Sequence, residues 1–175
     1  MEEKTKKISL IATDGFEEAE LIYPYYRLKE AGYDVKLISV KNKIINGEHG
    51  YPIAVDMGIE EIDEEITESF DGVVLPGGIK NPDLLRREKK VLDFIKALNE
   101  KGKLVAAISY AGWLLISSRI IKDRKVTSYY AMRHDMKRPG VKFENSPVVI
   151  DGNLITSRMA IDLPDFMKSI LEFLK

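Results

Sequence analysis

The sequence predicts a single α/β domain over residues 1–175, with a doubly wound, mostly parallel sheet flanked by helices. Short apolar runs that are rich in β-branched residues alternate along the chain with helical patterns, and turn signals separate them. A strand at 7–12, a helix from Glu17 and a strand at 34–40 follow one another within about 40 residues, and such a unit implies a parallel sheet. The length of 175 residues suits one domain.

The N-terminal half supplies the first strand–helix–strand unit and an excursion from it. The first helix is expected to end at Ala31-Gly32, and Pro24 is expected to bend it or to mark its first turn. Two glycines and one proline between residues 46 and 56 indicate a hairpin or an irregular excursion, and the acidic stretch 60–68 indicates a short exposed helix. The inward stripe of the first helix comprises Leu21, Ile22, Tyr25 and Leu28.

The second half continues the alternation. Buried strands are expected at 73–75 and 104–108, with helices at 83–101 and 111–118 after them. Strands at 148–150 and 154–156 flank the turn signal Asp151-Gly152-Asn153 and predict a hairpin, and Asp162 is expected to cap the last helix, with Pro164 early in it. The inward face of helix 83–101 comprises Leu84, Leu85, Val91, Leu92, Ile95 and Leu98.

Composition excludes several kinds of function. The chain has no cysteine, which rules out disulfides, thiolate metal sites and thiol catalysis. His49 and His134 are the only histidines and lack ligand spacing, so no metal is expected; no Gly-x-Gly-x-x-Gly or P-loop pattern follows the first strand, so no cofactor is expected. A net charge of −1 offers no basic excess for nucleic acid or membrane, and the absence of a signal peptide or long apolar run predicts a cytoplasmic protein.

Three predicted strand ends carry the residues that point to chemistry, because ligands in such folds bind at the carboxyl ends of the strands. They are residues 13–15, 76–78 and 109–112. Ser109 directly follows an apolar strand and precedes a helix, which is the geometry of a nucleophile elbow. A serine that simply caps the helix is the alternative.

Other residues near these strand ends fit a catalytic pocket or ordinary structure. The turn Gly77-Gly78 is expected to present free N–H groups, which with the Tyr110 N–H would form an oxyanion hole, or else it is only a tight turn. Glu20 is expected to point towards Ser109, or else it only favours the dipole of its helix. The aromatic side chains of Trp113 and of Tyr129, which Tyr130 follows, either line a pocket or belong to the core.

Taken together, these motifs resemble the PfpI/ThiJ family of the class I glutamine-amidotransferase-like superfamily, whose fold is flavodoxin-like. Members have been described as intracellular proteases, glyoxalases or deglycases, and chaperone-like proteins. The resemblance covers nearly the whole chain, and several motifs occur in the family's order. They are residues 14–21, 75–78 with 81–83, 105–109, 127–129, 149–158 and 162–164.

The resemblance implies roles for individual residues. Ser109 matches the family's nucleophilic cysteine, Tyr110 matches the neighbouring histidine, and Glu20 matches the glutamate that hydrogen-bonds the cysteine. Gly78 and the backbone of Tyr110 match the oxyanion hole. Tyr129 matches a pocket tyrosine, and Asp83 lies near an acid that reaches a neighbouring subunit in oligomeric members.

The two departures, serine for cysteine and tyrosine for histidine, remove the family's thiol chemistry because a serine hydroxyl needs an adjacent base. One hypothesis is therefore a PfpI-like protein that retains a pocket for a small carbonyl compound or peptide, or an oligomeric role, without that activity. The alternative is a hydrolase, peptidase or deglycase-like, that uses Ser109 with Glu20 or His134 as base. A chaperone-like assembly is a third, and the resemblance implies a homo-oligomer, dimeric or larger.

Overall fold

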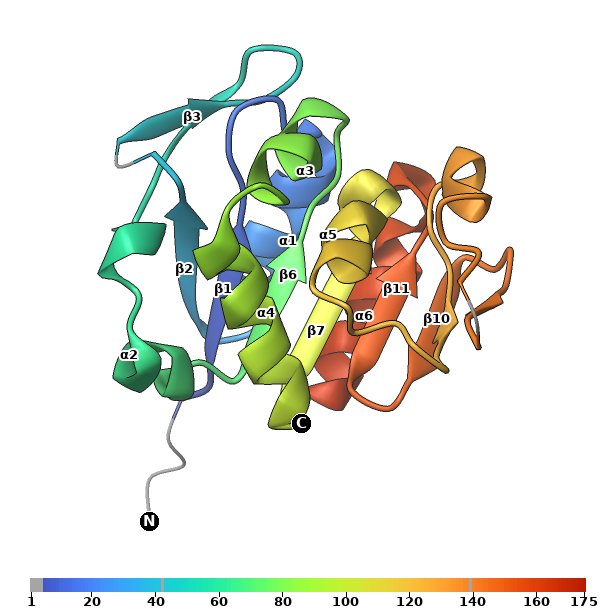
Figure 1. Cartoon of the computed structure of the whole chain (residues 1–175). Coiled ribbons are helices and arrows are strands. Elements are labelled where there is room, and N and C mark those ends of the chain that lie inside the picture. Colours follow the sequence, from blue (N-terminus) through green and yellow to red (C-terminus); the bar gives the residue numbers. More distant parts are fainter. Residues whose placement is uncertain (1–4, 42, 139) are drawn as a thin grey trace.

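The computed structural model describes residues 5–41, 43–138 and 140–175. At its centre lies a seven-stranded sheet with the order β10-β11-β7-β6-β1-β2-β5 (Figure 1). Neighbouring strands run parallel except for the β10–β11 hairpin at one edge. The predicted doubly wound, mostly parallel sheet is thus confirmed. The strands are β1 (Lys7–Ile11), β2 (Asp34–Ser39), β5 (Met57–Gly58), β6 (Gly72–Leu75), β7 (Leu104–Ile108), β10 (Val148–Asp151) and β11 (Leu154–Ser157).

Helices cover both faces of this sheet (Figure 1). On one face pack α1 (Glu18–Glu30) and α6 (Leu163–Phe173), and on the other pack α2 (Glu64–Ser69), α3 (Lys80–Leu85), α4 (Lys89–Glu100) and α5 (Gly112–Ser117). Two small sheets lie outside the main one: the antiparallel hairpin β3 (Ile44–Asn46)–β4 (Pro52–Ala54), and the parallel pair β8 (Lys125–Val126)–β9 (Lys142–Phe143). In the ranges described, no helix is both long and apolar enough to cross a membrane.

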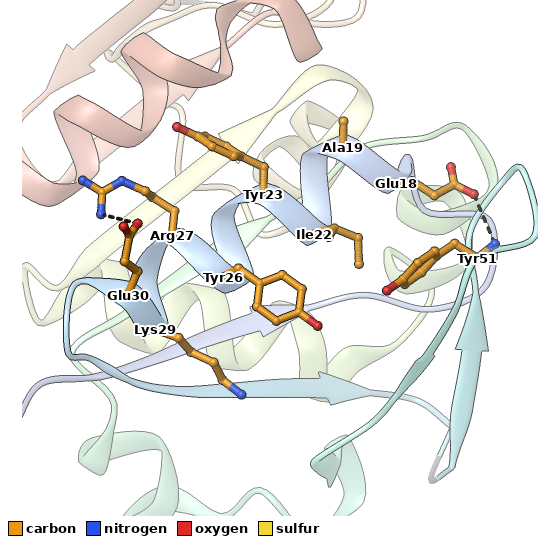
Figure 2. A pocket seen from close by; sticks show the side chains of 9 residues that line it. All are labelled: Glu18, Ala19, Ile22, Tyr23, Tyr26, Arg27, Lys29, Glu30 and Tyr51. Atoms are coloured by element: carbon orange, nitrogen blue, oxygen red, sulfur yellow. Dashed lines mark hydrogen bonds and ion pairs between the residues drawn. The ribbon is translucent and has the colours of Figure 1, made fainter.

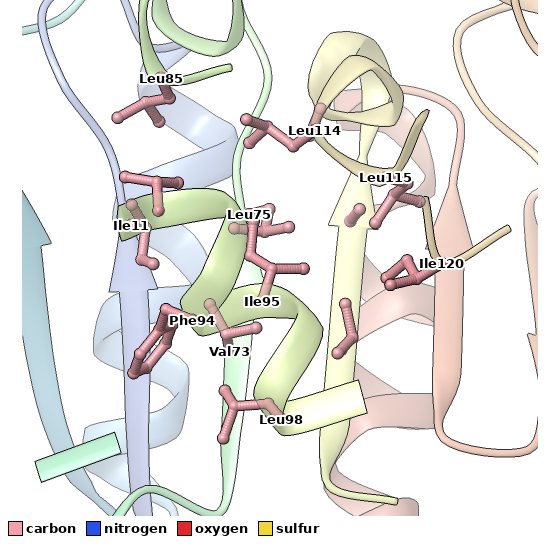
Figure 3. Close-up of a cluster of buried hydrophobic side chains, with 14 of the residues drawn as sticks. Ile11, Val73, Leu75, Leu85, Phe94, Ile95, Leu98, Leu114, Leu115 and Ile120 are labelled. Atoms are coloured by element: carbon pink, nitrogen blue, oxygen red, sulfur yellow. The ribbon is translucent and has the colours of Figure 1, made fainter. Parts of the chain in front are cut away.

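Two hydrophobic cores result because the central strands are buried on both faces. Val73 and Leu75 of β6 belong to the core under α4 and α5, whereas Val74 between them belongs to the core under α1 and α6. Figure 3 shows the first of these cores, in which Phe94 and Leu98 of α4 lie over the strands. Continuous apolar runs therefore suit these strands better than strict alternation.

The predicted helix 83–101 is wrong as a single element. The chain forms α3, breaks over residues 86–88, and begins α4 at Lys89, with Glu88 in an extended conformation. A continuous helix would need an apolar residue near position 88 to join Leu85 to Val91, but that stretch is charged. Leu84, expected to face inward, is only half-buried.

Three local predictions also need correction. Of the two alternatives for Pro24, the first-turn position is wrong, because Pro24 lies in the interior of α1. Asp162 stands at the start of α6 without capping it through its side chain, because its carboxylate accepts hydrogen bonds from Arg158 instead. The expected helix 60–68 is a 3₁₀ turn, Ile59–Glu61, followed by the separate helix α2.

Candidate active site

Ser109 occupies a sharp turn at the carboxyl end of β7. It opens the 3₁₀ turn Ser109–Ala111 between β7 and α5, and its φ of 60° is left-handed. Such a conformation costs a non-glycine residue about 1–2 kcal/mol, so surrounding contacts must hold it. The N-cap residue of α5 is Ala111, so Ser109 does not cap this helix. This is the strand–turn–helix context that a nucleophile elbow requires.

Ser128, which the sequence analysis did not single out as a site residue, stabilises this turn through a hydrogen bond to its backbone. Its hydroxyl donates a hydrogen bond to the Ser109 carbonyl oxygen at 2.6 Å, and both side chains are buried. A Cβ at Gly112 would lie 2.7 Å from the Ser128 hydroxyl oxygen. Gly112 is therefore needed for this approach as well as for the tight turn.

Glu20 reaches from the first turn of α1 to the carboxyl end of β6. It is 2% exposed, and its Oε2 accepts a hydrogen bond from the Gly77 N–H at 2.8 Å. A Cβ at Gly77 would lie 2.5 Å from Glu20 Oε2 and 2.7 Å from Ser109 Cβ, so Glu20 and Ser109 both abut this glycine. The expectation of a free Gly77 N–H is therefore wrong, because the carboxyl group occupies it.

Burial raises the pKa of Glu20 to about 8, and the nearby carboxylates of Glu17 and Glu48 contribute in the same direction. The hydrogen bonds from the Gly77 amide and the Ser109 side chain oppose this rise but do not cancel it. Glu20 is accordingly protonated at neutral pH and shares a hydrogen bond with the hydroxyl of Ser109.

Asn81 joins the loop after β1 to the loop after β6, which carries Gly77. Its fully buried side chain accepts a hydrogen bond from the Thr13 N–H at 2.7 Å and donates to the carbonyl oxygens of Pro76 and Gly77 at 2.9 and 3.0 Å. The sequence showed Asn81 only as part of a motif. The only sequence signal for this role was a polar residue three positions after the Gly77-Gly78 pair. Nothing in the local sequence indicated which backbone groups it would bond.

The β3–β4 hairpin brings a further carboxylate to the site. Its tip is held by Glu18, whose Oε1 accepts from the His49 N–H at 2.6 Å and whose Oε2 lies 2.9 Å from His49 Nδ1. The Glu48 N–H donates to the Phe16 carbonyl oxygen at 2.8 Å, which fixes Glu48 near the loop before α1. Glu48 is close enough to raise the pKa of both Glu20 and Tyr110, a role that the sequence analysis missed.

Three aromatic side chains form a cluster beside the Ser109 turn. The Tyr110 ring lies 5.3 Å from the Trp113 ring and 5.1 Å from the Tyr129 ring, measured between centroids. Trp113 Nε1 donates to Asp135 Oδ2 at 3.1 Å. Burial raises the pKa of Tyr110, so its phenol stays protonated at neutral pH.

The remaining candidates form no hydrogen bond or ion pair with Ser109 or Glu20 within the described residues. Asp83 is half-buried and forms an ion pair with Arg87, four residues further on. His134 is exposed at the end of the 3₁₀ turn Tyr130–Arg133, and His49 is exposed and paired with Glu18. Across the described ranges, no group of three or more histidine, aspartate or glutamate side chains is arranged to hold a metal ion.

Fold and site together define a doubly wound α/β protein with a strained elbow beside a buried glutamate. The DJ-1/PfpI family model matches residues 6–173, and the chain belongs to this family. Deglycase PfpI of Pyrococcus furiosus is 39% identical over 169 residues, which cover 97% of this chain and 99% of that protein. Protein/nucleic acid deglycase 2 of Escherichia coli is 35% identical over 173 residues, with 97% and 98% coverage.

Solved structures agree with this assignment. A two-domain protein of Anabaena variabilis with DJ-1/ThiJ/PfpI-like and ferritin-like domains superposes with a TM-score of 0.91 at 33% identity, over 97% of this chain and 48% of that one. The chain thus spans about half of that protein. DJ-1beta of Drosophila melanogaster superposes with a TM-score of 0.86 at 27% identity, over 96% of this chain and 89% of the other.

A first prediction concerns the dependence of stability on pH. The folded chain keeps the Glu20 proton up to about pH 8, whereas the unfolded chain loses it near the ordinary glutamate pKa of 4.5. This group therefore stabilises the fold fully below pH 4.5 and progressively less as pH rises to about 8. The wild type should lose up to about 1.4 kcal/mol per pH unit relative to Glu20→Gln across this window. Urea unfolding of both proteins at several pH values measures this difference; parallel curves would contradict the raised pKa.

Proposed function

We propose that this DJ-1/PfpI protein binds a small carbonyl compound, or a peptide carbonyl, at the Ser109 turn and lacks the family's cysteine-dependent turnover. One observation carries the proposal: Glu20, on whose carboxyl group the Ser109 side chain acts, and Tyr110, the next residue along the chain, are both held in their protonated forms at neutral pH. Neither accepts the Ser109 proton there, and a neutral hydroxyl is a poor nucleophile.

Binding is supported by two backbone donors, one next to Gly77 and one next to Ser109 in the chain. Gly78 has a left-handed φ of 80°, and a Cβ there would meet the Gly15 carbonyl oxygen at 2.4 Å, so only glycine fits. In the part of the chain that the structure describes, the Gly78 N–H has no acceptor, and the Tyr110 N–H lies in the first turn of the 3₁₀ segment, where a backbone N–H has no intrahelical partner. Two such donors suit a carbonyl oxygen.

Restoring the family's pair tests this proposal. The double variant Ser109→Cys/Tyr110→His should turn over methylglyoxal roughly a hundredfold faster than the wild type, because a thiolate and a base are added to an intact frame. A colorimetric assay of remaining methylglyoxal measures the rate. Ser109→Ala/Tyr110→His is the matched control and should stay at the wild-type level. Robust turnover by the wild type that disappears in Ser109→Ala would reject the proposal.

A hydrolase that uses Ser109 is the second candidate, and the pKa of Glu20 near 8 favours it at alkaline pH. Once ionised, the Glu20 carboxylate is a stronger base than an ordinary glutamate and already shares a hydrogen bond with the Ser109 side chain. The strained turn at Ser109 has the form that hydrolases use to expose a nucleophile.

A fluorophosphonate probe separates the two candidates. If Ser109 is a nucleophile, labelling should rise about tenfold per pH unit below pH 8 and level off above it, as the Glu20 carboxylate forms. Glu20→Gln should remove this rise, and Ser109→Ala should remove the label, both followed by intact-protein mass spectrometry. The absence of any adduct at high pH would count against the hydrolase.

Self-association is proposed as part of the function, through an exposed tyrosine face on α1. Tyr23, Tyr26 and Tyr51 line a surface hollow of about 990 Å³. The rings of Tyr26 and Tyr51 lie towards each other, and Tyr26 is 56% exposed (Figure 2). The same face is acidic at its start, with Glu18, and basic at its end, with Lys29. A second copy packed antiparallel across a twofold axis would therefore bring opposite charges together over paired apolar centres.

Tyr26→Lys tests this interface. The variant should shift the chain from dimer to monomer, because it places like charges at the centre of the twofold contact. Light scattering after size-exclusion chromatography measures the mass. Ile161→Lys is the matched control, since Ile161 is even more exposed but lies outside this face, and its mass should not change. A wild type that is monomeric at working concentration would remove support for the interface.

A further inference from the structure

The segment from residue 119 to residue 142 carries a strong local excess of positive charge. It holds eight lysines and arginines but only two aspartates, whereas the whole chain has a net charge of −1. Some of these cations are engaged: Arg124 lies 3.3 Å from an Asp151 carboxylate oxygen, and Arg133 stacks 4.3 Å from the centroid of the Tyr130 ring. Others surround a hollow.

This basic hollow lies at the carboxyl end of α5, at the opposite end of that helix from Ser109. Its volume is about 380 Å³, and it is lined by Ile116, Arg119, Ile121, Lys122 and Arg138. The two isoleucines give it an apolar wall, and Ile121 is almost fully buried. Three cations thus converge on a surface that also offers contact to an apolar group.

No acidic group neutralises these three cations within the described ranges. None of them has a carboxylate oxygen within 4.0 Å. Asp123 is the nearest acid in sequence, and its Oδ1 sits against Gly140, where a Cβ would approach to 1.8 Å. Asp135, the other acid of the segment, accepts the hydrogen bond from Trp113. None of the three cations is therefore held in an ion pair, although the Asp123 carboxylate lies beside Gly140.

Arg119 occupies a backbone position at which glycine is strongly favoured. Its φ is 60°, its N–H bonds the Ile116 carbonyl oxygen at 3.1 Å, and the next N–H bonds the Leu115 carbonyl oxygen at 3.3 Å. These two bonds are the pattern that ends a helix through a left-handed residue. An arginine here destabilises the fold relative to glycine, yet its side chain lines the hollow.

We propose that the basic hollow binds a small amphipathic anion, a phosphate or carboxylate that carries one apolar group. The anionic end would meet Arg119, Lys122 and Arg138, and the apolar end would pack on Ile116 and Ile121. An inorganic anion leaves the apolar wall unused. A nucleic acid strand is the less favoured occupant, because the hollow itself offers three cations and two others of the segment, Arg124 and Arg133, are engaged.

Phenyl phosphate is the probe for this site, and two-dimensional NMR of the ¹⁵N-labelled full chain is the measurement. Saturable amide shifts are expected at residues 116–122 and 138, with inorganic phosphate and benzyl alcohol at least about tenfold weaker, because each supplies half of the contacts. Affinity should fall as salt is raised. Shifts spread over all basic residues, or tighter binding of a single-stranded oligonucleotide at these amides, would overturn the proposal.

Arg119→Gly gives the sharper test because binding and stability should move in opposite directions. The variant should bind phenyl phosphate at least about fivefold more weakly, while its unfolding midpoint should rise by about 2 °C as the left-handed strain is relieved. Lys137→Gln removes one charge from the same segment outside the hollow and should change affinity less than about twofold. Unchanged binding in Arg119→Gly would overturn the proposal.

Discussion

The hydrogen bond from the Gly77 amide to the buried Glu20 carboxyl is the contact on which the rest of the site depends. It joins α1 to the loop after β6, and it leaves space at Gly77 only for a hydrogen atom between Glu20 and Ser109. Because the carboxyl group is removed from water and faces other acids, its pKa rises and it stays neutral where ordinary glutamates are charged. The burial of Glu20 against Gly77 thus determines both where its carboxyl group lies and that this group is protonated.

The frame around Ser109 is maintained by polar groups that bond to backbone rather than to substrate. Asn81 ties the loops after β1 and β6 together, and Ser128 holds the carbonyl of the left-handed Ser109. A buried network with every partner present is rigid, and losing one partner leaves a desolvated group unpaired. The sharp turn at Ser109 is therefore held by its own neighbours, in a chain that has no cysteine.

The sequence allowed most of the fold to be predicted because its signals are local. The apolar run that ends at Ile108 and the glycine pair that follows Leu75 indicated two buried strands and where each one ends. The break before Lys89 was missed because the helix was predicted from its apolar residues alone, without regard to the charged residues 86–88 between them. The meeting of Glu20 with Ser109 followed from strand order and family resemblance. The contributions of Glu48 and Ser128 depend on a hairpin and a loop whose positions no local pattern specifies.

The neutral state of Glu20 has a consequence for how the chain exchanges protons with its surroundings. At neutral pH the folded protein holds a proton that the unfolded chain does not, because solvation returns the carboxyl group to its ordinary acidity. Each molecule that unfolds therefore releases that proton to the buffer. The heat absorbed in a calorimetric scan would then depend on the ionisation enthalpy of the buffer chosen, so the chain's folding is also an acid–base reaction.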